Sequence, residues 1–401
     1  MDPKEEKVDS VEGKFATAII YAKTLEETAR KQIELLCDQE IFQGSNPRVM
    51  PDSHAGKGCV IGFTAILNDI VVPYLIGFDI GCGMRTSKLG KIDIDYESLD
   101  NFIRQNIPCG FKRNKIIDEA VTPEFYDEIM VICHKLQAFY GMKLKHTTKQ
   151  KQINNLNRLI DSLEPQEQAK AIGSLGGGNH FIEVNEDSEN NKYLVVHSGS
   201  RNFGLQVCNY HQQIAKFNCE GKNVQKDLEY LTGEDKEFYL MDMQIAQRFA
   251  ELNREVITGR ILSHLGMEDK DSFDTVHNYI DFENNIMRKG AISAYEGEKV
   301  LIPLNMRDGS IIAVGKGNEE WNYSAPHGAG RIMGRKQAER VLDFDEYKET
   351  MKDVWTSSVC KDTIDEAPMA YKPADEIIEA IQDTVDIVDI IKPLYNFKAK
   401  N

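Results

Sequence analysis

The stretch Ser324-Ala325-Pro326-His327-Gly328-Ala329-Gly330-Arg331 sets a histidine between a proline and a Gly-Ala-Gly turn, with an arginine directly after it. Proline fixes its own φ and offers no N–H, while glycines let the backbone approach a ligand closely. Successive N–H groups in a glycine-rich turn suit an anion. Taken alone, the stretch fits an anion-binding loop and a tight turn with an incidental histidine equally well. The rest of the chain decides between them.

Charge and cysteine content narrow the class of protein. The 401 residues carry 48 Lys and Arg against 64 Asp and Glu, a formal net charge of −16. An acidic chain is not expected to coat nucleic acid nonspecifically, so any RNA role needs a local basic pocket or metal ions. The eight cysteines are scattered without a Cys-x-x-Cys pair or a signal peptide, which favours reduced thiols in the cytoplasm. No apolar run approaches the roughly 18 residues of a spanning helix, so no membrane association is expected.

Strand and helix patterns are mixed without a regular βαβ rhythm, internal repeat or dividing linker. Strands are expected at 15–22, within 49–64, and at 193–197, 300–304 and 310–314. Helices are expected at 26–37 (with Thr24 and Glu27 as a capping box), 123–141, 148–170, 235–265, 275–284 and 374–392. Residues 1–13 are charged and expected to be frayed. The sequence predicts one α+β domain over 1–401, with mixed sheets, surrounding helices, and a helical layer or insertion at about 96–172 away from the catalytic loops.

Five metal-ligand side chains lie on glycine-rich loops or beside other motifs. Asp79 and Cys82 are three apart in GFDIGCGM, His180 enters a strand, His197 ends the next strand, and His277 is expected in a helix. One carboxylate, one thiolate and three imidazoles suit a divalent transition metal, or two metals sharing a ligand. On ligand softness alone the expected metal is zinc.

Two arginines, Arg201 in HSGSR and Arg331 in HGAGR, each follow a histidine by four residues on a tight loop. Arginine recognises phosphate bidentately, so the pair favours a phosphate substrate. In PDSHAGKG, His54 shares a loop with Asp52 and Lys57 and either orients a water or phosphate or makes an Asx-type turn. The remaining candidates among the helical histidines are expected to face solvent or pack: His134, His146, His211 and His264.

Together these motifs resemble the RtcB RNA ligases. The resemblance rests on PDSHAGKG, GFDIGCGM, GSLGGGNHFIEV, HSGSRNFG, VHNYI, GKGNEEWNYSAPHGAGRIMGR and DEAPMAYK, which occur in the family's order over residues 50–372. It implies an RtcB-like fold with a central cleft lined by glycine-rich loops. It also implies an RNA ligase that uses GTP and manganese to join an RNA 3′-phosphate or 2′,3′-cyclic phosphate to a 5′-hydroxyl.

The resemblance also assigns roles to residues. His327 would be the nucleophile that forms a histidine–GMP intermediate, with Arg331 as a phosphate clamp. Two Mn²⁺, rather than zinc, would be held by Asp79, Cys82, His180, His197 and His277, with Cys82 bridging. The nucleotide would be contacted by Asn179, Phe181, Glu183, Gly328, Ala329, Gly330, Tyr371 and Lys398, the last in place of the family's closing Lys-Gly.

Two departures and two rivals accompany this interpretation. The family's Ile-Pro-Gly-Ser-Met-Gly loop is replaced by residues 302–309, and its Met-Ser-Arg by Met333-Gly334-Arg335. Both changes suggest a divergent bacterial paralogue branch, devoted to RNA repair rather than tRNA splicing, acting as a monomer or weak dimer with or without an archease-type activator. The rivals are a metal-dependent RNA phosphohydrolase or cyclic phosphodiesterase, and a non-catalytic RNA-binding paralogue.

Overall fold

A computed structural model describes residues 9–399 of the chain. Its largest sheet has seven strands in the order β12-β13-β15-β6-β7-β5-β8. These strands are β12 (Lys299–Asn305), β13 (Gly309–Gly315), β15 (Val385–Lys398), β6 (Phe181–Glu186), β7 (Lys192–Ser198), β5 (Gly83–Gly90) and β8 (Ser272–Val276). Every neighbouring pair in this sheet is antiparallel. The β15 strand lies inside the sheet, between β13 and β6, although it is the last element of the chain.

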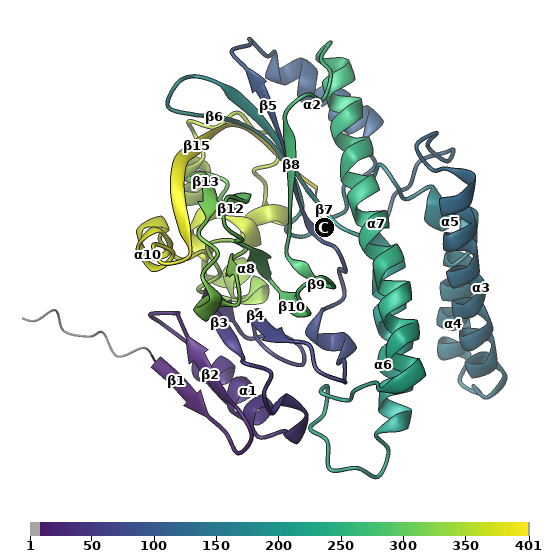
Figure 1. Cartoon of the computed structure of the whole chain (residues 1–401). Coiled ribbons are helices and arrows are strands. Elements are labelled where there is room, and N and C mark those ends of the chain that lie inside the picture. The colour runs from purple at the N-terminus through teal and green to yellow at the C-terminus, as the bar shows by residue number, and fades with distance from the viewer. Residues whose placement is uncertain (1–8, 400–401) are drawn as a thin grey trace, which may run out of the picture.

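A second sheet lies below the first in the view of Figure 1. Its order is β1-β2-β3-β4-β10-β9, and only the β2–β3 pair is parallel. The strands are β1 (Asp9–Glu12), β2 (Thr17–Ile20), β3 (Arg48–His54), β4 (Ile61–Ile66), β10 (Ile286–Lys289) and β9 (Asn278–Asp281). The strands β11 (Ala291–Ser293) and β14 (Ser324–Pro326) form a small antiparallel pair. The last residue of β14 directly precedes His327.

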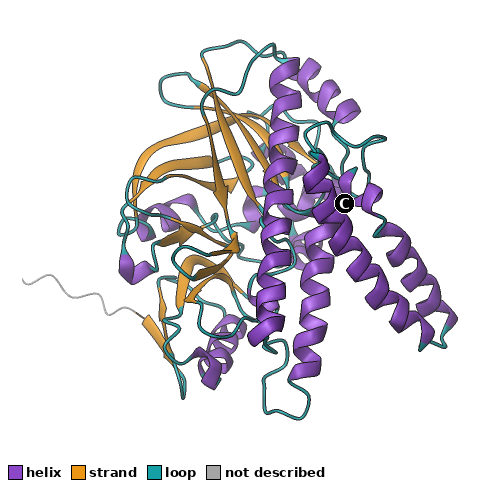
Figure 2. Ribbon diagram, turned by 45° about the vertical axis from the view of Figure 1, so that its right-hand side comes forward, coloured by secondary structure: helices purple, strands orange, loops and turns teal. Residues whose placement is uncertain are grey.

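Long helices cover one side of the molecule (Figures 1 and 2). The α7 helix (Gly233–His264) packs on β5 and β7, and α6 (Arg201–Asn218) packs on α7. Further out lie α3 (Pro123–Lys145), α4 (Gln150–Ser162) and α5 (Pro165–Ala169). The remaining helices are α1 (Glu27–Cys37), α2 (Tyr96–Asn106), α8 (Arg335–Val341), α9 (Phe344–Thr350) and α10 (Ala374–Ala380). None of the helices within 9–399 combines the length and apolar character needed to cross a bilayer.

The alternation of side chains along β7 separates a packing face from a second face. Leu194 and Val196 pack against Ile257 and Ile261 of α7 in one buried cluster. Val195, which points the other way, belongs to a different cluster. Because successive residues of a strand face opposite sides, His197 shares the face of Val195, away from α7.

The α+β class is confirmed, and the helices expected at 123–141 and 235–265 correspond to α3 and α7. The helix expected at 148–170 is divided into α4 and α5 by Leu163 and Glu164. The 96–172 segment is largely helical, as expected.

Two helical predictions near the site are wrong. Residues 275–281 belong to strands β8 and β9 with His277 between them, and 282–284 form a turn. The His277 N–H donates to Cys82 O, and its carbonyl accepts from Gly290 N. The tail is helical only to Ala380 and then becomes β15. In both segments β-branched and aromatic residues find cross-strand partners, and these tertiary contacts override the helical pattern.

The predictions at the N-terminus and after β7 also need correction. Residues 9–12 form β1 rather than a frayed end, while 1–8 lie outside the described residues. The α1 helix begins at Glu27 and its N-cap is Glu26 rather than Thr24, with no side-chain cap; the Thr24 hydroxyl donates to Glu376 Oε1. Arg201 is not confined to a tight loop, because it is the first residue of α6, which the sequence analysis did not predict.

Candidate active site

Three neighbouring strands of the seven-stranded sheet, β15, β6 and β7, direct Lys398, Glu183 and His197 to the face away from α7. On β6, Phe181 pairs with His197 of β7, and on β15 Lys398 pairs with Phe181. The intervening residues Ile182 and Phe397 pack toward α7. Strand register alone therefore brings together residues that lie more than 200 positions apart in the sequence.

Cys82, His180 and His197 form a buried cluster of metal-ligand type. The Cys82 Sγ lies 3.4 Å from His180 Nε2 and 3.3 Å from His197 Nε2, and Asp79 Oδ2 lies 3.0 Å from His180 Nε2. The His277 ring adjoins this cluster, with its centroid 5.1 Å from that of His197. The structure thus brings the five predicted ligand residues into one neighbourhood.

The protonation states and the unsatisfied nitrogens of this cluster are compatible with a bound cation. Burial, and then the charge of Asp79, raise the pKa of the Cys82 thiol well above its usual value. Burial also lowers the pKa values of His197 and His277 well below their usual value, which keeps both imidazoles neutral. The buried Nδ1 atoms of these two rings have no hydrogen-bond partner in the described structure. Neutral imidazoles, a thiol beside a carboxylate, and unsatisfied buried nitrogens fit a transition-metal site.

A glycine allows the loop before β6 to pass close to this cluster without a steric clash. The loop before β6 reaches His180 through Gly176, which has a φ of +97°. A Cβ at Gly176 would overlap the guanidinium of Arg201 and would lie 2.7 Å from His180 Nδ1. His180 Nδ1 is fixed instead by Leu175 O at 2.8 Å, which directs Nε2 toward Cys82.

His327 follows β14 and lies between the metal-type cluster and a pocket. Its ring centroid is 4.9 Å from that of His277. Asp52 Oδ2, fully buried, lies 2.6 Å from His327 Nδ1 as an ion-pair contact and accepts the backbone N–H of His327 at 3.2 Å. The contact to Nδ1 is not aligned as a hydrogen bond in this structure. With Nδ1 facing a carboxylate, Nε2 is the nitrogen left for chemistry.

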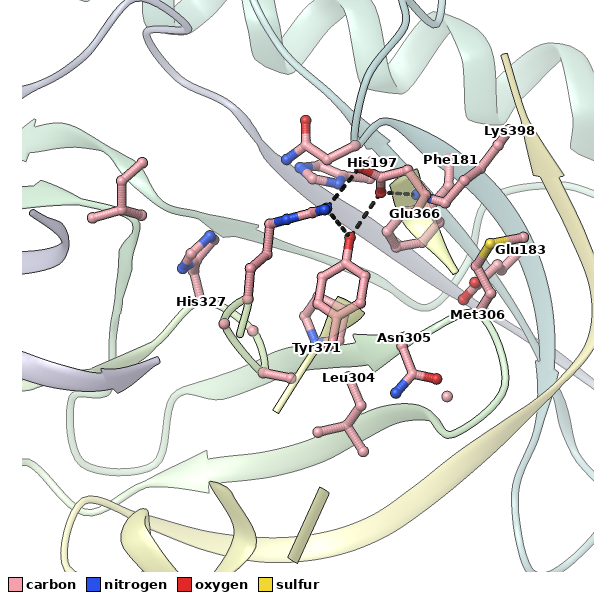
Figure 3. Close-up of a pocket in the computed structure, with 18 of the residues that line it drawn as sticks. Phe181, Glu183, His197, Leu304, Asn305, Met306, His327, Glu366, Tyr371 and Lys398 are labelled. Carbon is pink, nitrogen blue, oxygen red and sulfur yellow. Dashed lines mark hydrogen bonds and ion pairs between the residues drawn. The ribbon is translucent and has the colours of Figure 1, made fainter. Parts of the chain in front are cut away.

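The pocket beside His327 has a volume of about 290 Å³ and is drawn in Figure 3. It includes the predicted nucleotide and phosphate residues Asn179, Phe181, Glu183, Gly328, Ala329, Gly330, Arg331, Tyr371 and Lys398. It also includes His54, which leaves both interpretations of that residue open, whereas Lys57 bonds to the Tyr74 hydroxyl at 3.2 Å. One cavity therefore collects residues from both ends of the chain.

Glu366 is the main pocket residue that the sequence analysis missed. Its buried carboxylate accepts from Tyr371 Oη at 2.8 Å and Lys398 Nζ at 2.7 Å (Figure 3), and from Arg331 Nη1 at 3.2 Å. Arg335 Nη2 lies 2.8 Å from it. Although burial opposes ionisation, Lys398 and Arg335 lower the pKa of Glu366 to about 2. Glu366 therefore holds three of the predicted contact residues in place.

The other residues in the contact network could be recognised only in part. Asp52 was noticed for its loop but not as the partner of His327, since 275 positions separate them. Arg335 was noticed only as part of a sequence departure. Arg201, placed as predicted near the ligand cluster, donates to Gly110 O at 2.6 Å and approaches Ser174 Oγ at 3.3 Å. The cue for Glu366 was its place in DEAPMAYK, beside Tyr371.

A protein-family model described as "tRNA-splicing ligase RtcB" matches residues 40–399. The chain belongs to the RtcB family. It is 29% identical over 378 residues to the RNA-splicing ligase RtcB of Escherichia coli K12, covering 85% of this chain and 86% of that relative. The tRNA-splicing ligase RtcB of Archaeoglobus fulgidus is 26% identical over 434 residues, covering 88% and 89%. The protein is thus an RNA ligase of the RtcB family.

The departures from the usual RtcB sequence lie on the pocket wall. Leu304, Asn305 and Met306 all line the cavity. Arg307 and Asp308 pair with each other at 2.7 Å at the tip of the β12–β13 hairpin. The side of this loop that faces the pocket therefore carries larger side chains than a Gly-Ser-Met-Gly loop would, and the charges of Arg307 and Asp308 neutralise each other.

The second departure affects the start of α8. Gly334 is the N-cap of this helix and has no side chain to accept a backbone N–H. A serine, as in the usual RtcB pattern, would offer its hydroxyl to the first turn of the helix. Arg335, the first helical residue, is held instead by Asp365 Oδ2 at 2.6 Å.

Proposed function

We propose that this RtcB protein joins an RNA 3′-phosphate or 2′,3′-cyclic phosphate to a 5′-hydroxyl with GTP, through a guanylate carried on His327. The observation that supports this most directly is the position of His327. Its ring contacts Asp52 on one side, adjoins the metal-type cluster on another, and borders the pocket. A phosphohydrolase would need the cluster but neither a buried carboxylate behind His327 nor a base-sized cavity beside it.

His327 supplies the first bond. With its Nδ1 proton held toward Asp52, Nε2 presents a lone pair to the α-phosphate of GTP, and pyrophosphate leaves as the N–P bond forms. A 3′-phosphate oxygen of the RNA then attacks the guanylate phosphorus and releases His327, giving an RNA end capped by GMP through a pyrophosphate. The 5′-hydroxyl finally attacks the RNA 3′-phosphorus, and GMP leaves. A cyclic phosphate is first opened by water to the 3′-phosphate.

The pocket residues would hold the guanine. Glu183 would accept the N1–H and N2–H of the base, Lys398 would donate to O6, and Tyr371 and Phe181 would cover the ring faces. Glu183 is buried and already bonded by Asn396 Nδ2 at 2.6 Å. A buried carboxylate and a buried ammonium that meet a base with matching donors and acceptors discriminate strongly against other bases.

Asp79, Cys82, His180, His197 and His277 would hold two Mn²⁺ ions, which supply charge neutralisation at phosphate oxygens when bound. Arg201 and Arg331 would add fixed positive charge on the RNA and nucleotide sides. For the biological setting we propose RNA repair in the cytoplasm, in keeping with a divergent bacterial branch.

Guanylylation can be tested on the purified protein. With GTP labelled at the α-phosphate and Mn²⁺, we expect a protein-bound label that is lost in acid, as phosphoramidates are, and no label from γ-labelled GTP. Chelation with EDTA should prevent labelling, and Mn²⁺ should restore it. A protein that opens cyclic phosphates but never retains the α-label would instead be the metal-dependent phosphohydrolase.

The affinity for GTP should depend on pH through Glu183. Burial raises the pKa of this carboxyl to about 7. Only the carboxylate accepts hydrogen bonds from both N1–H and N2–H, so binding strengthens as the pH rises through 7 and weakens by about tenfold per unit below it. Calorimetric titration with GTP between pH 5.5 and 8 measures this. Glu183→Gln should bind more weakly and lose this part of the pH dependence, and an identical profile in that variant would contradict the assignment.

A further inference from the structure

A turn outside the pocket carries an exposed aromatic side chain among positive charges. It joins α2 to α3 and contains Cys109-Gly110-Phe111-Lys112-Arg113-Asn114-Lys115. Phe111 is fully exposed, and Lys112 and Lys115 are exposed as well. This exposed ring is directly followed by three cations, Lys112, Arg113 and Lys115, in a chain whose net charge is −16.

The turn is fastened to the edge of the active site. Arg201 Nη2 donates to Gly110 O at 2.6 Å, and Gly110 N donates to Gly176 O at 2.9 Å. Gly176 is the residue that passes beside His180 and Arg201. One hydrogen bond therefore links the backbone beside Phe111 to the loop that positions His180, and another links it to Arg201.

The positive charges near the turn act on a common neighbour. Burial raises the pKa of the Cys109 thiol to about 11, and the charges of Arg201, Arg104 and Lys112 act in the opposite direction. Arg113 is occupied by Glu167 at 3.1 Å. The ammonium groups of Lys112 and Lys115, by contrast, form no ion pair with any residue between 9 and 399. Two exposed lysines without an ion-pair partner among residues 9–399 therefore lie one and four positions after the exposed ring.

We propose that this turn is a binding site for single-stranded RNA next to the joined ends, with Phe111 stacking on a base and Lys112 and Lys115 contacting the adjacent phosphates. An aromatic platform beside cations is the combination that unpaired nucleic acid recognises. An apolar protein partner would match Phe111 but would leave the two ammonium groups without counter-charges. The inference rests on the RNA-ligase activity of the family and adds a subsite that lies within the helical segment.

Fluorescence anisotropy with a labelled RNA of about ten nucleotides tests the stacking contact in the full chain without GTP. Phe111→Ala should weaken binding by about tenfold, while Phe111→Tyr should bind nearly as tightly as the wild type. Phe217→Ala is the matched control, because Phe217 is 76% exposed at the far end of α6, about 24 Å along the helix from Arg201. Equal binding by Phe111→Ala and wild type would overturn the proposal.

The phosphate contacts have a separate signature. Lys112→Ala and Lys115→Ala should each reduce the slope of log affinity against log salt by about 0.7. Because Phe111 contacts no other side chain, its removal should leave the thermal unfolding temperature unchanged, which separates lost binding from lost fold. If neither lysine changes the salt slope, the ring is not flanked by phosphates and the site is not an RNA site.

Two RNA probes identify the bound strand, one ending in a 3′-phosphate and the other beginning with a 5′-hydroxyl. We expect Phe111→Ala to weaken one of them selectively, and an abasic nucleotide at one position of that strand to abolish the difference between variant and wild type. A uniform loss that persists with every abasic substitution would reject stacking. Since these measurements omit GTP, failure of the histidine–guanylate mechanism would leave them interpretable.

Discussion

Replacement of His327 by alanine is expected to abolish both the covalent guanylate and RNA joining. Alanine has no nucleophile. Of the other two histidines that line the pocket, His54 lies on β3 with its Nδ1 3.2 Å from Asp52 O, and His197 has its Nε2 3.3 Å from Cys82 Sγ. Both the adduct and the joined RNA should fall below the detection limit, since no other group can carry the guanylate to the RNA. Labelling with α-labelled GTP, followed by electrophoresis, measures the adduct directly.

The design of this experiment separates chemistry from folding. His134→Ala, which removes an exposed histidine of α3, serves as the matched control and should label fully. The His327→Ala protein should still bind GTP, because the pocket walls are unaffected. It should also join RNA that already carries the guanylate cap, since that step needs no new adduct. An adduct that survives in His327→Ala would place the nucleophile elsewhere and reject the mechanism.

Replacement of Asp52 by asparagine is expected to slow guanylylation by about 100-fold to 10,000-fold. The buried carboxylate lies 2.6 Å from His327 Nδ1, and in the proposed mechanism it would favour the tautomer with Nε2 unprotonated. It also stabilises the positive charge that the imidazole acquires in the transition state. Asparagine keeps the size of the side chain but removes that charge, and its amide can donate toward Nδ1 and favour the wrong tautomer. Single-turnover labelling rates measure the effect.

The controls for Asp52 use its neighbour in sequence. Ser53→Ala should label at the wild-type rate, because the buried Ser53 hydroxyl has no hydrogen-bond partner in the described structure. The dissociation constant for GTP should change little in Asp52→Asn, since the carboxylate faces the histidine and not the cavity. A proportional loss of GTP affinity and labelling rate would instead make Asp52 a structural residue of the pocket.

Local sequence patterns predicted most of the chain's helices, and the residues that they singled out lie together in the structure. The glycine-rich loops pointed to His180 and His327 as candidate functional residues, because backbone freedom and close approach are properties of single residues and their neighbours. Strand register then explains why the predicted residues meet: β6, β7 and β15 present one face to the pocket. Register follows from tertiary pairing and could not be read from the sequence.

The errors share a physical cause. Residues 275–284 and 385–392 were predicted to be helical, yet 275–281 and 385–392 lie in or between strands because neighbouring strands offer partners for their backbone groups. Glu366 was missed because a glutamate in a polar stretch normally faces solvent. Its burial depends on Arg331 and Arg335, from the stretch that follows β14, and on Lys398, from the end of β15. Long-range charge pairing leaves no signature in the local sequence.

The place of β15 within the large sheet has a consequence for biosynthesis. Because β15 lies between β13 and β6 and ends with Lys398, the pocket wall remains incomplete until the ribosome has delivered residue 398. Asp52 is synthesised early, and its contact with His327 can form only after most of the chain has been translated. Truncated chains translated from a broken messenger RNA would therefore lack a complete pocket. An enzyme molecule can therefore be active only if its messenger RNA was translated as far as residue 398.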